Sequence, residues 1–162
     1  MSTNVLLAFM LGALPISEIR GGALYVFATS SDTFTASIGL LASLIGNLLV
    51  PFMAYGVLDL LDAAFRSKYT PSIVKRAYLM ILEHGRRRAR NVKSGGYIAL
   101  ALFVGIPLPV TGAWTGTLVA YVLGLSRKKS IVAIELGVLL ATVVVTLTFL
   151  LGLEILRRIF LL

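Results

Sequence analysis

The sequence contains no cysteine among its 162 residues, which excludes disulfide bonds, thiolate metal sites and cysteine nucleophiles. It contains a single histidine, and neither a Gly-rich phosphate-binding loop nor a cluster of metal-ligand residues accompanies it. Acidic residues are also scarce, with 7 Asp and Glu against 15 Lys and Arg. We therefore expect a protein that is not an enzyme and that uses no cofactor or metal ion.

Long polar stretches are also lacking. The hydrophobic share is 58%, whereas soluble domains contain roughly 45–50% apolar residues even with glycine counted. The longest polar stretch, residues 59–96, is too short and too basic to form a core of its own. This composition predicts an all-α polytopic membrane protein with a single membrane domain, residues 1–162.

The net charge of +8 is concentrated in two places. Nine of the basic residues lie between Arg66 and Lys93, and three more occupy positions 127–129. Apolar and basic residues alternate at helical spacing after Pro71, as in helices that lie flat on a membrane and contact anionic lipids. We predict that four arginines of this helix bind lipid head groups: Arg86, Arg87, Arg88 and Arg90. No nucleic-acid recognition motif accompanies the charge, so nucleic acid is not an expected partner.

Two apolar segments are interrupted where a membrane helix should be continuous. Residues 5–29 are broken at Pro15–Gly22, and residues 97–125 are broken at Pro107–Gly116. Proline removes a backbone donor and clashes with the preceding turn, and each remaining piece is well short of the ~20 residues that a span requires. In lipid, a broken backbone must find partners in protein or at a cavity, and such breaks form binding sites in transporters.

The two uninterrupted segments, residues 33–58 and 130–153, are long enough to cross a bilayer. If all four segments crossed, the basic loops 59–94 and 126–129 would lie on opposite sides, against the positive-inside tendency. If the broken segments are re-entrant, both loops are cytoplasmic and both termini lie outside. Short halves that cross separately would give the same sidedness.

The predicted fold therefore has two inverted halves, residues 1–58 and 95–162. Each half is a broken re-entrant helix pair plus a transmembrane helix, and the cytoplasmic basic connection 59–94 carries the amphipathic helix between them. Inverted repeats with broken helices are a transporter design.

Polar residues at the breaks are the candidates for binding substrate and protons. Glu18 and Arg20 place two charges at bilayer depth, where each costs about 2.5–3.5 kcal/mol on insertion scales. Their alternative role is a structural ion pair. Asn47 either binds substrate or, as we prefer, forms hydrogen bonds to the broken segments.

The second break offers hydroxyls, free amides and an indole that could line a ligand path. Alternatively, its threonines satisfy the broken backbone and Trp114 anchors at a membrane interface. The candidates in this break are Pro107, Pro109, Thr111, Gly112, Trp114 and Thr115.

Three motifs resemble those of the small multidrug export protein family. They are Glu18-Ile-Arg-Gly-Gly22, Gly46-Asn47 with Pro51, and above all Pro107-Leu-Pro-Val-Thr-Gly-Ala-Trp-Thr-Gly116. This family is similar to the DedA/VTT membrane proteins, and the resemblance implies facing re-entrant helices, proton coupling and movement of lipids such as polyprenyl phosphates. The second DedA-type motif carries arginines, where this sequence has Thr111 and Trp114.

These observations predict a proton-coupled transporter or flippase of the cell membrane. Its substrate would be a small amphipathic molecule or a lipid phosphate, and the small size of the chain favours a homodimer. The alternative is a non-transport membrane scaffold or assembly factor whose basic helix binds anionic lipid or a protein partner. An intramembrane enzyme is disfavoured because no nucleophile–base pair is present.

Overall fold

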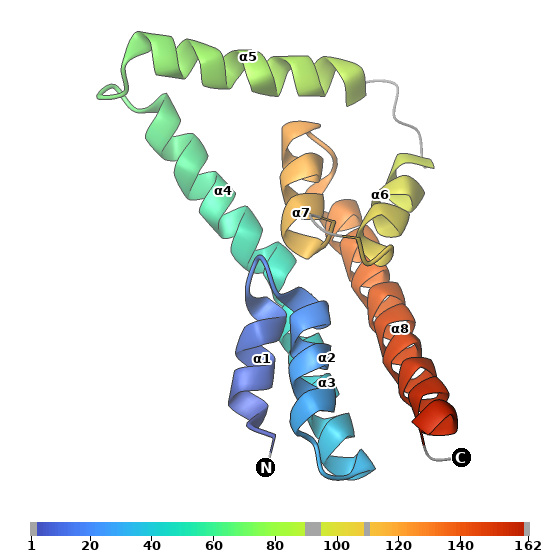
Figure 1. The fold of residues 1–162 in the computed structure, drawn as a ribbon. Coiled ribbons are helices and arrows are strands. Elements are labelled where there is room, and N and C mark those ends of the chain that lie inside the picture. Colours follow the sequence, from blue (N-terminus) through green and yellow to red (C-terminus); the bar gives the residue numbers. More distant parts are fainter. Residues whose placement is uncertain (1–2, 90–94, 109–110, 161–162) are drawn as a thin grey trace.

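The computed structural model describes residues 3–89, 95–108 and 111–160, and side chains at 88–89 and 153–160 lie outside that description. Over these residues the only regular secondary structure is helical (Figure 1). The helices are α1 (Val5–Ala13), α2 (Glu18–Thr29), α3 (Thr33–Leu48), α4 (Val50–Arg66), α5 (Ser72–Ala89), α6 (Gly95–Gly105), α7 (Ala113–Val122) and α8 (Arg127–Phe160).

Two segments are long and apolar enough to cross a membrane, as predicted. They are Thr33–Arg66, in which α3 continues into α4 with a break at Leu49, and Arg127–Gly152 within α8. The predicted end of the first segment at residue 58 was wrong, because the helix continues to Arg66. Asp62 and Arg66 stabilise the added turns through an ion pair of 2.8 Å at i,i+4 spacing.

The remaining apolar helices form two hairpins, α1–α2 and α6–α7, which enter from opposite ends of the molecule and bend near its middle (Figure 1). The first arm of each hairpin packs along the long helix that follows its hairpin, α1 on α3 and α6 on α8. The second arm of each hairpin contacts the other long segment, α2 on α8 and α7 on α4. We call this arrangement, in which the second arm of each hairpin contacts the long segment of the other half, the exchange of contacts. It brings the two bends together.

Both breaks are shorter than the sequence suggested. The first covers residues 14–17, so Gly21 and Gly22 lie inside α2. A Cβ at Gly22 would collide with the Ser43 hydroxyl, which shows that this glycine allows close helix packing and does not interrupt the helix. At the second break α6 ends at Gly105 and α7 begins at Ala113, so Trp114 and Thr115 lie in the first turn of α7.

Side-chain caps fix the ends of the N-terminal helices. Asn4 accepts a hydrogen bond from the Leu7 amide at 3.2 Å and caps α1. Asp32 accepts one from the Thr35 amide at 2.9 Å and caps α3. This backbone hydrogen bond holds the pKa of the Asp32 carboxyl below its usual range.

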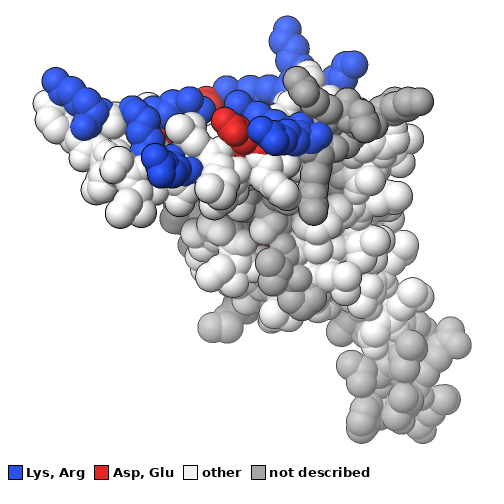
Figure 2. Space-filling model, turned by 90° about the horizontal axis from the view of Figure 1, so that it is seen from above, with Lys and Arg blue, Asp and Glu red and all other residues white. Residues whose placement is uncertain are grey.

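Helix α5 lies across one end of the molecule, beyond the ends of α4 and α7 (Figure 1). Tyr78 attaches it to α4 by donating a hydrogen bond to Asp62 at 2.7 Å and stacking on Phe65 at 4.8 Å. Burial raises the pKa of the Tyr78 hydroxyl, and the hydrogen bond to Asp62 raises it further. Figure 2 shows that Lys and Arg gather in a band across this end, with few acidic side chains between them.

Candidate functional site

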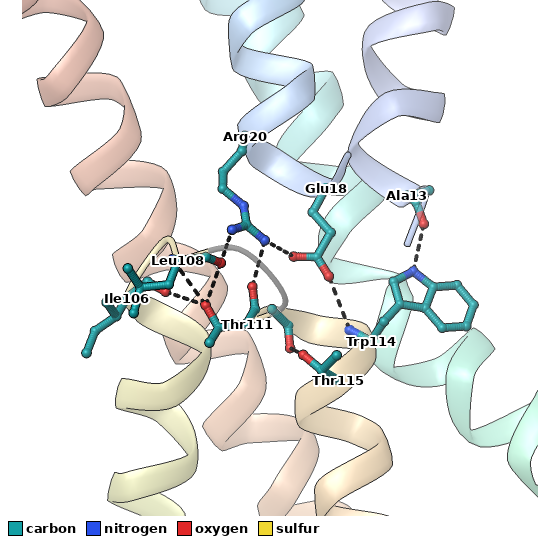
Figure 3. Close-up of polar contacts among 9 residues, drawn as sticks. Ala13, Glu18, Arg20, Ile106, Leu108, Thr111, Trp114 and Thr115 are labelled. Carbon is teal, nitrogen blue, oxygen red and sulfur yellow. Dashed lines mark hydrogen bonds and ion pairs between the residues drawn. The ribbon is translucent and has the colours of Figure 1, made fainter. Parts of the chain in front are cut away.

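Glu18 is the acidic centre of the place where the two bends meet (Figure 3). It begins α2 with a φ of 48°, a left-handed conformation that is uncommon for a residue other than glycine. Its side chain is 4% exposed, and Oε1 accepts a hydrogen bond from the Trp114 amide at 3.3 Å. The carboxylate thus caps α7 from the opposite hairpin, where free amides and the helix dipole favour an anion.

Gly112 makes this approach possible. It immediately precedes α7, and a Cβ at this position would overlap the Glu18 carboxylate. Gly112 was predicted as a residue that binds substrate or protons. In the structure, the absence of a side chain at this position allows the two hairpins to come into contact.

Arg20 joins the two bends through charge and through the backbone. Its guanidinium lies 3.6 Å from Oε2 of Glu18, so the two charges predicted from the sequence form an ion pair. Nη1 donates to the Leu108 carbonyl, and Nη2 donates to the Thr111 carbonyl at 2.7 Å (Figure 3). The planar fork of arginine is suited to such paired acceptors. Arg20 therefore holds the second break in place from the first hairpin.

The hydroxyls and the indole of the second break mainly satisfy backbone groups. Thr111 donates to the Ile106 carbonyl at 2.7 Å, and Thr115 donates to the Gly112 carbonyl at 3.2 Å. The indole of Trp114 donates to the Ala13 carbonyl, at the end of α1, at 2.9 Å. The N–H of Trp114 is therefore directed at the first hairpin, and its alternative role as an anchor at the membrane interface stays a prediction.

Asn47 is buried at the same level of the molecule, with 1% of its surface exposed. We preferred the prediction that Asn47 forms hydrogen bonds to the broken segments. Its side-chain carbonyl oxygen, however, accepts no hydrogen bond from the described residues. The bends instead meet through Glu18 and Arg20. A cavity of about 10 Å³ remains among Asn47, Glu18 and Gly112, which is close to the minimum for one water molecule.

A larger cleft of about 770 Å³ opens beside this contact. Glu18, Arg20 and Thr111 contribute polar groups to it, and both bends line it, through residues that include Pro15, Ile16 and Pro107. The α2 and α8 helices supply a largely apolar part of the wall: Leu24, Val145, Thr148 and Phe149. The α8 residues were not predicted, because Thr148 is one of three threonines in a long apolar run and nothing distinguishes it there.

Comparison with known proteins identifies the family of this chain. The family described as "Putative small multi-drug export protein" matches residues 18–144. The chain belongs to this family. The matched region begins at Glu18 and includes the whole second break. No curated protein and no solved structure matches the chain.

In this small multi-drug export family protein, the predicted head-group arginines lie away from the cleft. Arg86 and Arg87 are exposed on α5, at the end of the molecule, whereas the cleft lies near the middle. Arg90, Pro109 and the side chain of Arg88 lie outside the described residues. Their proposed roles stay predictions, as do the substrate-binding roles of the residues at the bends.

Proposed function

We propose that the chain is a proton-coupled membrane transporter or flippase without catalytic chemistry of its own. The observation that supports this most is the buried Glu18–Arg20 pair, which joins the two bends and also faces the 770 Å³ cleft. Ionisable residues within the membrane are rare and commonly mark substrate or proton pathways. A pair that faces the cleft and also holds the two hairpins together is suited to coupling substrate binding to the contact between the hairpins.

The cleft suggests an amphipathic substrate. The Arg20 side chain is 26% exposed and supplies a cation for an anionic group such as a lipid phosphate. Leu24, Val145 and Phe149 supply an apolar wall for the rest of the molecule. The small multi-drug export family name fits the export of such compounds.

Coupling follows from the charge balance of the pair. While Glu18 is ionised, it neutralises Arg20 and caps α7. Protonation of Glu18 removes that compensation, so the guanidinium gains affinity for an anionic substrate and the hold between the hairpins weakens. Proton and anionic substrate therefore favour each other's binding, and this mutual effect is a coupling free energy between two sites.

The proposed membrane arrangement has both hairpins re-entrant and the two halves inverted. The exchange of contacts supports it, since α2 reaches α8 as α7 reaches α4. The basic end, with α5 and residues 126–129, lies in the cytoplasm. A single copy encloses the cleft on few sides, so we propose that two copies form the working unit.

Single cysteines test this arrangement cleanly because the chain has none. We expect Lys68→Cys and Ser126→Cys to react only with a reagent added on the cytoplasmic side, and Ser31→Cys only from outside. These three residues are exposed at the ends of the molecule. Labelling of positions 68 and 126 from opposite sides would contradict the re-entrant model.

Transport in proteoliposomes tests the function itself. We expect Glu18→Gln to reduce proton-driven movement of a fluorescent lipid phosphate by about tenfold, within the range of typical coupling free energies. Glu83→Gln removes an equal charge at an exposed site on α5 and should transport normally. No transport of this probe by the wild type, or full activity of Glu18→Gln, would reject the proposal.

The scaffold alternative has its own supporting observation. Helix α5 exposes Ile73 and Met80, with 81% and 64% of their surfaces accessible, beside several basic residues. If α5 binds a partner and the cleft transports nothing, reversing the charges of Arg86 and Arg87 should abolish function in cells. Glu18→Gln should then be tolerated, which is the opposite of the transporter expectation.

A further inference from the structure

A groove of about 880 Å³ runs between α6 and α8, and its two parts differ in chemistry. Lys128 and Lys129 line the end nearest the α7–α8 loop, while the remainder is lined mainly by apolar side chains such as Ile98, Leu136 and Leu140. Among the described residues, no acidic side chain lines it. The groove shares no lining residue with the cleft described above.

Small residues create the hollow, and backbone contact keeps it open. Ala101 of α6 and Ala133 of α8 line the groove. One turn further along α8, a Cβ at Gly137 would lie 2.6 Å from the Ala101 carbonyl oxygen, so the two backbones already touch. The helices cannot close further to fill the space with their own side chains.

The length of the groove matches one leaflet of a bilayer. Lys128 and Leu140 are 140 − 128 = 12 residues apart on α8, which corresponds to about 18 Å along a helix. Half of the ~30 Å hydrocarbon core is about 15 Å. A lipid whose head group lies at the lysines would therefore extend its acyl chain along the whole apolar part.

The basic end of the groove carries two lysines that are not paired with an acidic side chain of the described residues. Arg127 is already paired with Asp59 at 2.8 Å and lies 4.6 Å from the Tyr55 ring. Lys128 and Lys129 are exposed and form no ion pair with the described residues. Tyr97 stands beside them, with its ring 5.9 Å from the Lys129 ammonium, and its hydroxyl accepts a hydrogen bond from the Ser126 amide at 3.2 Å.

We propose that this groove binds one anionic phospholipid of the surrounding bilayer. Lys128 and Lys129 bind its phosphate, Tyr97 lies at the level of the head group, and one acyl chain lies between α6 and α8. The proposal requires only that the chain is in a membrane, so it is independent of whether the cleft at Glu18 transports a substrate.

A fluorophore beside the groove tests the proposal in vesicles. Leu139→Cys places the label next to the groove without lining it, and Met53→Cys provides a reference site on α4. Both residues are exposed. Leu139 lies 12 residues after the start of α8 at Arg127, and Met53 lies 13 residues before the end of α4 at Arg66. Both of these helix ends are at the basic end of the molecule, so the two labels lie at similar depth. The full chain is reconstituted in phosphatidylcholine containing equal mole fractions of either brominated phosphatidylglycerol or brominated phosphatidylcholine, and quenching is compared.

We expect phosphatidylglycerol to show an apparent binding constant at Leu139 at least about threefold above that of phosphatidylcholine, because each lysine near the surface favours an anionic lipid. The double variant Lys128→Gln/Lys129→Gln should remove the preference. The matched variant Lys68→Gln/Lys75→Gln loses the same charge at the same end and should retain it. Circular dichroism confirms that each variant is folded.

Three results would overturn the proposal. The first is equal quenching by the two lipids at Leu139. The second is an equal preference at Met53, which would show diffuse enrichment of anionic lipid around a basic surface. The third is a preference that survives the Lys128/Lys129 changes, or that is lost equally with the Lys68/Lys75 changes.

Discussion

Replacing Arg20 by alanine is expected to lower the free energy of unfolding by about 2–3 kcal/mol. Breaking a fully buried ion pair by removing one partner costs about 3–5 kcal/mol, and the 26% exposure of the Arg20 side chain reduces that figure. The loss has two sources: Glu18 remains buried without its counter-ion, and the carbonyls of Leu108 and Thr111 each lose the guanidinium as a hydrogen-bond donor. Thermal melting of the purified protein in detergent measures the effect.

Two further variants separate charge from geometry. Arg20→Lys retains the charge near Glu18 but cannot donate to both carbonyls as a planar fork, so its melting temperature should be intermediate. Arg66→Ala breaks an exposed pair with Asp62, which is worth only about 0.3–0.5 kcal/mol at i,i+4 spacing. Equal melting temperatures for Arg20→Ala and Arg66→Ala would show that Arg20 does not hold the hairpins together.

Gly46→Ala should destabilise the protein, whereas Gly56→Ala should stabilise it. A Cβ at Gly46 would collide with the carbonyl oxygen of Phe9, which is backbone of α1 and cannot rotate away. Overpacking of this kind costs about 1–3 kcal/mol, and the helix propensity gained from alanine, about 1 kcal/mol, offsets only part of it. At Gly56 nothing lies within 4 Å, so the propensity gain is not opposed.

The two glycines form a matched pair because both lie in the Thr33–Arg66 segment and receive the same substitution. We expect their unfolding free energies to differ by about 1–3 kcal/mol, which is the packing cost alone, because the propensity gain is common to both substitutions and cancels. Equal stabilities would mean that α1 can move away from α3 at no cost. That result would contradict the close packing of the first hairpin described above.

Much of the architecture was accessible from the sequence because proline and charge act locally. Pro15 and Pro107 marked both bends, and the long uncharged runs marked both segments that are long and apolar enough to cross a membrane. The exact bounds were not accessible. Gly22 looked like a helix breaker but lies within α2 where it meets Ser43, and only the packed structure distinguishes these two uses of glycine.

The C-terminal part of α4 illustrates a different difficulty. The sequence placed residues 59–66 in the basic connection, yet they continue α4, and Asp59 pairs with Arg127 of α8, a residue far away in the chain. Such a partner cannot be chosen in advance among fifteen basic residues. The predicted end of the helix was therefore too early.

The sequence singled out Glu18, Arg20, Thr111 and Trp114 as candidates, but it did not indicate that the last two contact the ionisable pair through backbone groups. Glu18 and Arg20 were conspicuous because charges are costly at bilayer depth. Their main contacts are the amide of Trp114 and the carbonyls of Leu108 and Thr111, and backbone groups of this kind are present at every position. Val145 and Phe149 of the cleft wall lie in a uniformly apolar run that gives no indication of which face is open.

The hydrogen bond from the Trp114 indole to the Ala13 carbonyl has a spectroscopic consequence. Trp114 is the only tryptophan of the chain, and it joins α7 to the end of α1. Its emission therefore reports, without any added dye, on the polarity at the junction of the two hairpins. A shift of that emission with pH, lost in Glu18→Gln, would make the separation of the bends visible in the unmodified protein.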